Sequence, residues 1–289
     1  MIVHLVDGTY ELFRQFYGRL RFRKDDESPL SAVGGVLHSI LEMIETGATH
    51  VGVATDHVIE SFRNRLWAGY KTGDGIDPAL LAQFHPLEEA LVAMGVAVWP
   101  MTELEADDAL ASAARIASAV NAVEKICIWT PDKDLAQCVR GDRIVQVDRK
   151  AKTIRNAEGV REKFGVEPAL IPDFLALVGD AADGIPGLPG FGERTASIVL
   201  ARYGDLDHIP ERASDWDVVV RGKERLAETL HARRSDADLY RKLATLSTDA
   251  PFATSLSDLR FAGVPRARFA AWCAETGVRE LADRPVRWA

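Results

Sequence analysis

Short apolar runs alternate with amphipathic stretches over the first 130 residues. A buried parallel strand is continuously apolar, whereas a helix repeats its apolar positions every three or four residues. On this basis the predicted strands are residues 2–6, 50–55, 96–100 and 125–130, and the predicted helices between them are residues 33–46, 79–94 and 108–120. The order predicts an α/β fold with a central, mainly parallel sheet flanked by helices.

The pattern changes after about residue 150. From residue 156 to 250 the apolar spacing is mostly helical, and the stretch DAADGIPGLPGFGERTA at 180–196 concentrates Gly and Pro. We interpret that stretch as a compact turn that leads into a helix. The helices predicted here cover residues 193–203, 221–232 and 236–246. We therefore expect an α/β domain over residues 1–166, a helical region over 167–250 and a C-terminal extension of uncertain structure over 251–289.

Composition describes an ordinary globular chain of 289 residues, 47% hydrophobic and 27% charged. The first residues, MIVHLVDGTY, lack the features of a signal peptide, and there is no apolar run of about 18 residues, so we expect a cytoplasmic protein without membrane contact. Three cysteines without metal-binding spacing argue against a disulfide framework. The formal charge of −8 argues against a nucleic-acid partner unless the acids are neutralised.

Carboxylates follow each of the four predicted strands. Asp7 ends the first strand, Asp56 the second, the acids of EADD at 105–108 follow the third, and Asp132 with Asp134 follows the fourth. A single Asp at such a position is usually a turn or helix-capping residue. Because the carboxyl ends of parallel strands share one edge of a sheet, the repetition predicts that these acids converge there.

Carboxylates packed closely repel one another, so such a cluster requires cations. Oxygen ligands without His or Cys favour Mg²⁺ or Mn²⁺ over Zn²⁺, and this many acids indicates two ions. A pair of divalent ions stabilises the attacking and leaving oxygens of a phosphodiester. The residues therefore predict metal-assisted phosphodiester hydrolysis.

Six motifs carry a family resemblance. They are LVDG at 5–8, TD at 55–56, FRNRLWAGYK at 62–71, EADD at 105–108, TPDKDLAQ at 130–137 and GDAADGIPGLPGFGERTA at 179–196. With this set, residues 1 to about 245 resemble the 5′-nuclease and flap-endonuclease family, in particular the bacterial form found at the N-terminus of DNA polymerase I and as free-standing 5′–3′ exonucleases. The resemblance implies a PIN-like nuclease domain with an arch at about residues 70–98, followed by a helix-three-turn-helix. It further implies a structure-specific 5′ nuclease of replication or repair.

The resemblance also implies roles for individual residues. The first metal site would be lined by Asp7, Asp56, Glu105, Asp107 and Asp108, with Asp107 or Asp108 also facing the second ion, and these five would act in catalysis with Lys71. The second site would be completed by Asp132, Asp134, Asp180 and Asp183. DNA would be bound by Arg14, Tyr70, Lys71, Gly187, Gly190, Gly192 and Arg194.

The expected partner is DNA with a 5′ end, as a flap, overhang or nick, bound by a monomer that uses no nucleotide cofactor. A potassium ion in the helix-three-turn-helix is a further implication of the resemblance. Nine metal-bound carboxylates would outweigh the whole formal charge of −8, so the acidic balance no longer excludes DNA. The chain ends where a polymerase would begin, which predicts a free-standing nuclease.

The arch region departs from the family pattern. Asp74 stands where a further basic residue is usual, and residues 72–98 contain no Lys or Arg. Threading of a single strand through an arch is therefore not implied for this chain.

Three other functions fit parts of the sequence. A haloacid-dehalogenase-type phosphatase is excluded because Leu5 occupies the position of its nucleophile. A non-catalytic DNA junction-binding protein of the same fold and a PIN-like ribonuclease remain as alternatives. Under the nuclease reading, Asp108→Asn is expected to abolish turnover and largely keep the fold, because it relieves repulsion among the acids.

Overall fold

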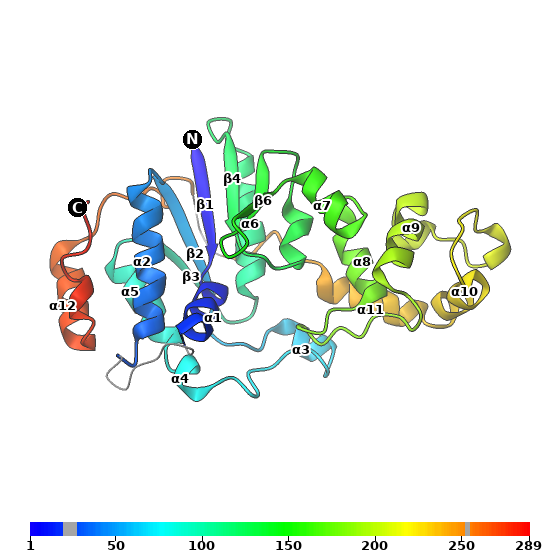
Figure 1. Ribbon diagram of the computed structural model, residues 1–289, viewed down its shortest axis with the longest axis horizontal. Helices are drawn as coiled ribbons and strands as arrows, with labels where there is room; N and C mark the ends of the chain where they lie inside the picture. The colour runs from blue at the N-terminus through cyan, green and yellow to red at the C-terminus, as the bar shows by residue number, and fades with distance from the viewer. Residues whose placement is uncertain (20–27, 252–254) are drawn as a thin grey trace. The chain divides into compact units, whose positions relative to one another are not determined.

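The computed structural model describes residues 1–19, 28–251 and 255–289 (Figure 1). Its contacts form two compact units that interleave along the chain. The first unit contains residues 1–59, 73–130 and 247–289, and the second contains residues 60–72 and 131–246. The domain boundaries expected at residues 166 and 250 stay a prediction. The contacts group the chain differently, because each of the two units combines segments that are separated in the sequence.

The first unit is built on parallel strands in the order β3-β2-β1-β4. Their bounds are Ile2–Asp7 (β1), His50–Asp56 (β2), Ala97–Met101 (β3) and Lys125–Trp129 (β4). All four predicted strands and the parallel sheet are thus confirmed. In the register, Asp7 lies opposite Ala54 and Asp56 opposite Met101, so the carboxyl ends of β1, β2 and β3 lie at one edge.

Helices complete the first unit (Figure 1). They are α1 (Gly8–Arg19), α2 (Ser31–Glu45), α4 (Pro78–Leu81), α5 (Phe84–Ala93), α6 (Ala106–Ser118) and α12 (Arg266–Thr276), with the short 3₁₀ helix η6 (Arg279–Leu281). Side chains of α1, α2, α5 and α12 share one core cluster, to which the C-terminal region contributes Phe269 and Trp272. The C-terminal extension, whose structure the sequence left uncertain, therefore contributes side chains to the hydrophobic core of the first unit.

The predicted helix over residues 79–94 is two helices, α4 and α5. Between them lies Gln83, whose side chain is buried and whose Oε1 accepts hydrogen bonds from Ala32 N (3.2 Å) and Val33 N (3.3 Å). These are donors at the start of α2, where a helix has no intrahelical acceptors. The interruption thus provides the cap of another helix, which local periodicity does not reveal.

The second unit is mainly helical. Its helices are α3 (Phe62–Leu66), α7 (Ala157–Phe164), α8 (Ile171–Val178), α9 (Glu193–Tyr203), α10 (Lys223–Ala232) and α11 (Arg234–Ala244), with the 3₁₀ helices η2 (Asp134–Cys138), η3 (Pro168–Leu170), η4 (Leu206–His208) and η5 (Ala213–Asp215). The predicted helices over 193–203, 221–232 and 236–246 are confirmed as α9, α10 and α11. An antiparallel hairpin of β5 (Ile144–Asp148) and β6 (Thr153–Arg155) was not predicted. Among the described helices of both units, none is long and apolar enough to cross a membrane.

Candidate functional site

Five acids lie at the carboxyl ends of β1, β2 and β3 in the first unit. We call Asp7, Asp56, Glu105, Asp107 and Asp108 the first acidic group. Asp7 and Asp56 are the last residues of their strands, whereas the other three lie at or just inside the start of α6, which follows β3. The sheet order places β1, β2 and β3 side by side, so the fold brings these segments to one edge.

Backbone and hydroxyl donors hold the strand-end acids. Asp7 is buried, and its carboxylate accepts from Tyr10 N (2.8 Å) and Thr130 Oγ1 (3.0 Å). Asp56 Oδ1 accepts from Ala106 N (2.9 Å), which ties the end of β2 to the first turn of α6. Such bonds fix the direction of each carboxylate.

At the start of α6, Asp108 is held from two sides. Asp108 is fully buried, its Oδ2 accepts from Glu105 N (3.0 Å), and its Oδ1 accepts from Ser247 N (2.7 Å). The first bond is half of a capping box between Glu105 and Asp108. Asp108 therefore has a structural role beside the metal role predicted for it. Asp107, next to it, is only half-buried.

The second acidic group lies in the helical unit and consists of Asp132, Asp134, Asp180 and Asp183. Two lysines neutralise part of it. Lys71 Nζ lies 2.8 Å from Asp183 Oδ1, and Lys133 Nζ lies 2.8 Å from Asp180 Oδ2. Lys133 was not among the predicted site residues, although it stands between two of the acids in the motif TPDKDLAQ.

Asp134 is the least compensated acid of this group. Its side chain is buried, and its Oδ1 has no hydrogen-bond partner among the described residues. Burial, and then the charges of Asp183 and Asp132, raise the pKa of Asp134 well above its ordinary value. Burial and the Asp183 charge likewise raise the pKa of Asp132, against the opposing charge of Lys71. A buried carboxylate oxygen without a donor is a position that suits a cation.

The donor set is compatible with the divalent ions that the sequence predicts. Both groups contain only carboxylates, the ligands of hard ions such as Mg²⁺ and Mn²⁺. In the side-chain arrangement of the described residues, no three His, Cys, Asp or Glu side chains already form a metal-binding set. The carboxylates accept instead from backbone, hydroxyl and lysine donors, of which the two lysine side chains are partly exposed.

The motif FRNRLWAGYK is anchored to the turn that carries Asp183. Lys71 N donates to Asp183 O (3.0 Å), Asn64 Nδ2 donates to Lys71 O (2.9 Å), and Trp67 Nε1 donates to Gly184 O (3.1 Å). These bonds explain how a lysine more than 100 residues away in sequence reaches Asp183. The motif is thus a positioning segment as well as a source of charge.

The Gly-rich turn between α8 and α9 contains glycines of two kinds. Gly187 has φ +69°, and a Cβ there would lie 2.5 Å from Gly179 N, so the turn itself requires glycine. Gly190 also has positive φ, at +93°. Gly192, the N-cap of α9, has extended backbone, and a Cβ there would meet nothing within 4 Å. Gly192 therefore leaves the helix N-terminus open to a ligand without being needed for the turn.

The other residues predicted to bind DNA differ in accessibility. Arg194 is exposed near the start of α9. Arg14 is bound by the buried Glu11, with Nη2 2.5 Å from Oε2. Tyr70 is only 3% exposed and belongs to the core of the helical unit, so its ring is packed instead of being presented to a base. The stacking role predicted for Tyr70 stays a prediction that requires the ring to move.

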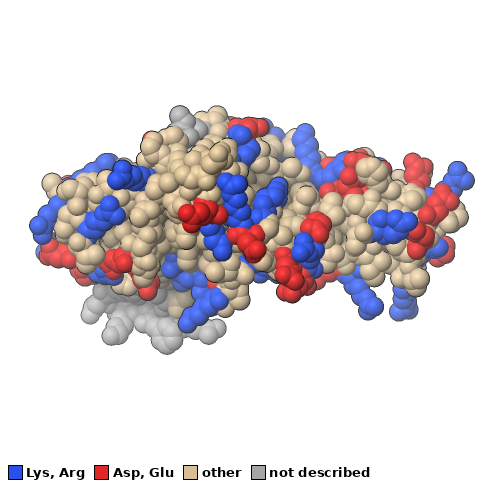
Figure 2. Space-filling model, turned by 90° about the horizontal axis from the view of Figure 1, so that it is seen from above, with Lys and Arg blue, Asp and Glu red and all other residues tan. Residues whose placement is uncertain are grey.

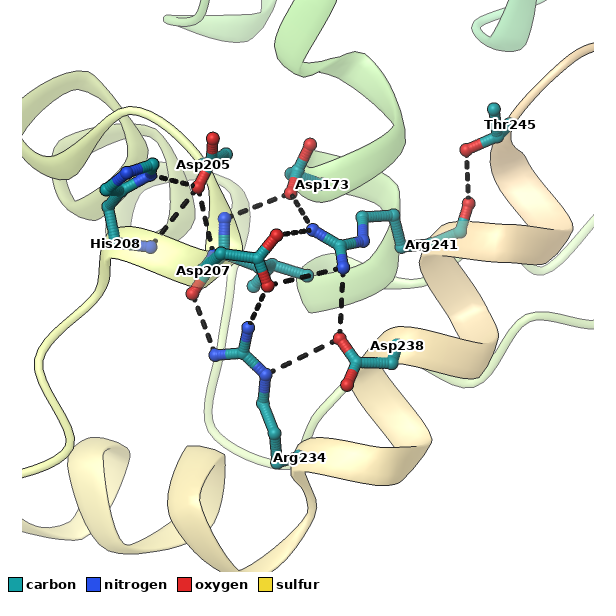
Figure 3. Close-up of polar contacts among 9 residues, drawn as sticks. Asp173, Asp205, Asp207, His208, Arg234, Asp238, Arg241 and Thr245 are labelled. Carbon is teal, nitrogen blue, oxygen red and sulfur yellow. Dashed lines mark hydrogen bonds and ion pairs between the residues drawn. The ribbon is translucent and has the colours of Figure 1, made fainter.

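An acid and arginine network supports the helical unit (Figure 3). Asp173 of α8 accepts from Leu206 N (3.0 Å), and Asp207 of η4 accepts from Arg241 (2.8 Å) and Arg234 (2.5 Å) of α11. The hydrogen bond from Arg241 lowers the pKa of Asp207, whereas burial raises the pKa of Asp173. The network ties α11 to η4 and α8, and α8 leads directly into the Gly-rich turn.

The face of the molecule drawn in Figure 2 carries charged side chains of both signs. Figure 2 shows Lys and Arg side chains mixed with Asp and Glu over the face in view. Arg202, a basic residue of α9, forms an ion pair with Asp217. The buried Arg63 has a structural role that its motif does not reveal, because its Nε donates to Leu243 O (2.8 Å) at the end of α11.

A parallel sheet with carboxylates at its strand ends, together with a helical unit built around a Gly-rich turn, places the chain in the class of resolvase-like nucleases. Family models agree over nearly the whole length. The model described as 5′–3′ exonuclease, N-terminal resolvase-like domain, matches residues 2–165, and that described as 5′–3′ exonuclease, C-terminal SAM fold, matches residues 166–267. The chain belongs to the 5′–3′ exonuclease family.

The similar proteins include 5′–3′ exonucleases of about the same length as this chain and much longer DNA polymerases. The 5′–3′ exonuclease of Buchnera aphidicola is 32% identical over 248 residues, which cover 85% of this chain and 81% of the relative. DNA polymerase I of Pseudomonas aeruginosa is 35% identical over 272 residues, which cover 91% of this chain but 29% of the polymerase. The chain thus spans under a third of the length of that polymerase.

Solved structures share the fold at low sequence identity. A T5 5′-exonuclease with bound divalent metal ions (zinc) matches with a TM-score of 0.67 and 17% identity, covering 98% of this chain and all of the other. The catalytic core of Rad2 in complex with DNA substrate matches with a TM-score of 0.61 and 15% identity, covering 98% of this chain and 90% of the other. The expected α/β nuclease fold with a helical region is confirmed.

Proposed function

We propose that this protein is a divalent-metal-dependent, structure-specific 5′ nuclease that hydrolyses DNA phosphodiesters. The observation that carries the proposal is the second acidic group, in which buried Asp134 has raised pKa and an oxygen without a hydrogen-bond partner among the described residues. A site that serves only to stabilise the fold is not expected to bury such a carboxylate. Family membership supports the same reaction class.

The first acidic group would hold one Mg²⁺ or Mn²⁺ and the second group another. When bound, such ions supply a hydroxide at neutral pH and stabilise the charge that develops on the phosphate. Asp7 and Asp56 would act as ligands already oriented by backbone and hydroxyl donors. The oxygens of Asp108 accept from backbone N–H groups, so its main contribution would be to hold Glu105 and the start of α6 in place.

The lysines of the second group would exchange partners when ions bind. In the free protein, Lys71 Nζ pairs with Asp183 Oδ1 and Lys133 Nζ pairs with Asp180 Oδ2, each at 2.8 Å. When the acids serve as metal ligands, the two ammonium groups would be available to bind DNA phosphates. The lysines would then stabilise the acids in the free protein and the substrate in the complex.

DNA binding would rest on the turn before α9. The open N-cap at Gly192 and the exposed Arg194 offer backbone N–H groups and a cation to a duplex phosphate. A potassium ion in this turn, a monomeric state and a cytoplasmic location belong to the same proposal. The neighbouring Rad2 structure contains a DNA substrate, which supports DNA as the ligand.

A panel of end-labelled DNA tests this function. Flap, 5′-overhang, nicked and blunt duplexes, with a single-stranded RNA of the same sequence, are incubated with Mg²⁺, Mn²⁺ or EDTA. We expect Mg²⁺-dependent or Mn²⁺-dependent products from DNA that carries a 5′ end. Cleavage that persists in EDTA would refute metal dependence. Binding without cleavage would support the junction-binding alternative, and preferential cleavage of RNA would support the ribonuclease.

A further inference from the structure

Two histidines form a surface stack beside the first acidic group. His57 directly follows Asp56 at the end of β2, and His85 lies in the first turn of α5. Their rings are nearly parallel, with centroids 4.2 Å apart and an interplanar angle of 9°. His85 is exposed, and the His57 side chain is 36% exposed. Both residues belong to the first unit.

A buried glutamate holds the stack in place. Glu88 is 7% exposed, and its two oxygens accept from Thr55 Oγ1 and His57 Nδ1, each at 2.8 Å. His85 Nε2 donates to His57 O (3.2 Å), and His57 N donates to Met101 O (2.8 Å). The His57 ring is therefore fixed through one nitrogen and one face, and little side-chain entropy remains to be lost when a ligand binds.

The geometry favours a flat ligand over a metal ion. The nitrogen lone pairs of imidazole lie in the ring plane, so those of two parallel stacked rings cannot converge on one ion. His57 Nδ1 is already committed to Glu88 and His85 Nε2 to a carbonyl. What the pair offers is the π-face of a ring, which in nucleic-acid-binding proteins receives an unstacked base.

The local charge favours the same ligand. Residues 72–98 contain no Lys or Arg but include Asp74, Asp77, Glu88 and Glu89, so a phosphate backbone finds no lysine or arginine partner in this segment. A nucleobase is uncharged, and its stacking on an aromatic ring depends little on sequence. A single strand near α5 would thus be held by its bases.

We propose that the His57 and His85 stack is a binding platform for an unpaired nucleobase in the single-stranded 5′ portion of the substrate. The inference rests on the proposed function for the identity of the ligand as DNA. His85 supplies the exposed ring, and Glu88 acts as a positioning residue through His57. The segment without Lys or Arg would in this way still bind a single strand.

Fluorescence binding and cleavage assays test the platform with four proteins. They are the wild type, His85→Ala, His85→Phe and, as a matched control on the same helix, Val92→Ala, which changes another partly exposed side chain of α5. The ligands are duplexes with a 5′ overhang of normal nucleotides that includes 2-aminopurine, an overhang of abasic nucleotides, or no overhang. 2-Aminopurine fluorescence is quenched when the base stacks.

We expect His85→Ala to weaken binding of the normal overhang by about 5- to 150-fold and to remove the fluorescence quenching. His85→Phe should retain both properties, since it keeps the ring and loses only the nitrogens. The wild type should bind the abasic overhang as weakly as His85→Ala binds the normal overhang. Val92→Ala should behave as the wild type. Blunt duplex should be bound equally by all four proteins.

Equal wild-type affinity for normal and abasic overhangs would overturn the platform, even if His85→Ala failed to fold. So would an equal loss on blunt duplex, which would indicate a general structural effect of the substitution. Failure of the proposed function has a different signature, namely that no DNA is cleaved in Mg²⁺ or Mn²⁺. The binding and quenching measurements need no turnover, so the two failures are distinguishable.

Discussion

The two acidic groups contain the same type of side chain but are stabilised in different ways. In the first, the carboxylates of Asp7, Asp56 and Asp108 accept from backbone N–H groups or a hydroxyl. In the second, the balance comes from the partly exposed ammonium groups of Lys71 and Lys133, and Asp134 has an oxygen without a donor among the described residues. The first group is therefore oriented by the fold itself, whereas under the proposed function the second group would change partners when a metal ion binds.

The largest expected effect comes from the least compensated acid. Asp134→Asn should lower the Mg²⁺-dependent cleavage rate by at least about 100-fold, because a proposed ligand is lost. In EDTA the same substitution should raise the free energy of unfolding, since burial and the charges of Asp183 and Asp132 disfavour the ionised side chain. Cleavage assays and urea unfolding in EDTA measure the two effects. A lower free energy of unfolding for Asp134→Asn than for the wild type in EDTA would contradict the view that Asp134 is uncompensated.

The opposite behaviour is expected of Asp108, which is fully buried and accepts two backbone N–H bonds. Asp108→Asn would point an amide NH₂ at Glu105 N or Ser247 N, so one buried donor would lose its acceptor. We expect a loss of about 2 kcal/mol in the free energy of unfolding, measured with urea at pH 7. This revises the expectation from sequence that the substitution would largely keep the fold.

These two aspartates show what sequence can and cannot predict. The four buried strands were predictable because each is a continuous apolar run, and the strand-end acids followed from the position of each run. The motifs predict both Asp108 and Asp134 as metal ligands and do not reveal that Asp108 is held by backbone donors, because that depends on distant groups such as Ser247 N. Strand β6 was missed because three residues with the exposed Ile154 carry no burial pattern.

Distant partners also explain the remaining differences. Gln83 interrupts a helical pattern because it caps α2, about 50 residues earlier. Arg63 is buried because carbonyl groups at residues 243 and 245 accept from it. Tyr70 is predicted to stack on a base, but its ring packs in the core of the helical unit. The sequence does not reveal this packing, because the other residues of that core are distant along the chain.

An intermediate effect is expected from the lysine that sequence reasoning overlooked. Lys133→Met should lower the free energy of unfolding in EDTA by up to about 1 kcal/mol, because Asp180 loses the partner at 2.8 Å and the side chain of Lys133 is 44% exposed. Mg²⁺ should reduce the difference from the wild type, since the ion replaces the lost charge. Urea unfolding with and without Mg²⁺ measures both values. An unchanged difference in saturating Mg²⁺ would show that Lys133 and the ion do not share Asp180.

The smallest effect concerns an acid that arginines balance permanently, Asp207. The hydrogen bond from Arg241 lowers the folded-state pKa of Asp207 below its ordinary value of 3.8. Its stabilising contribution is therefore present above pH 3.8 and is lost as the pH falls through the folded-state pKa. The side chain is 58% exposed, so we expect Asp207→Asn to lower the free energy of unfolding by only about 0.5 kcal/mol at pH 7.

Urea unfolding of the wild type, Asp207→Asn and Asp215→Asn between pH 7 and pH 3 measures this contribution. Asp215 is a suitable control because it is an exposed aspartate whose carboxylate accepts from the adjacent Ser214. Relative to Asp215→Asn, the deficit of Asp207→Asn should stay constant down to about pH 5 and shrink as the pH falls below 3.8. The contribution of Asp134 to stability has the opposite pH dependence. Because its folded-state pKa is raised, its ionisation lowers the free energy of unfolding as the pH rises. If Asp207→Asn instead gained stability relative to the wild type at pH 7, arginine pairing would not distinguish a structural acid from one that awaits a metal ion.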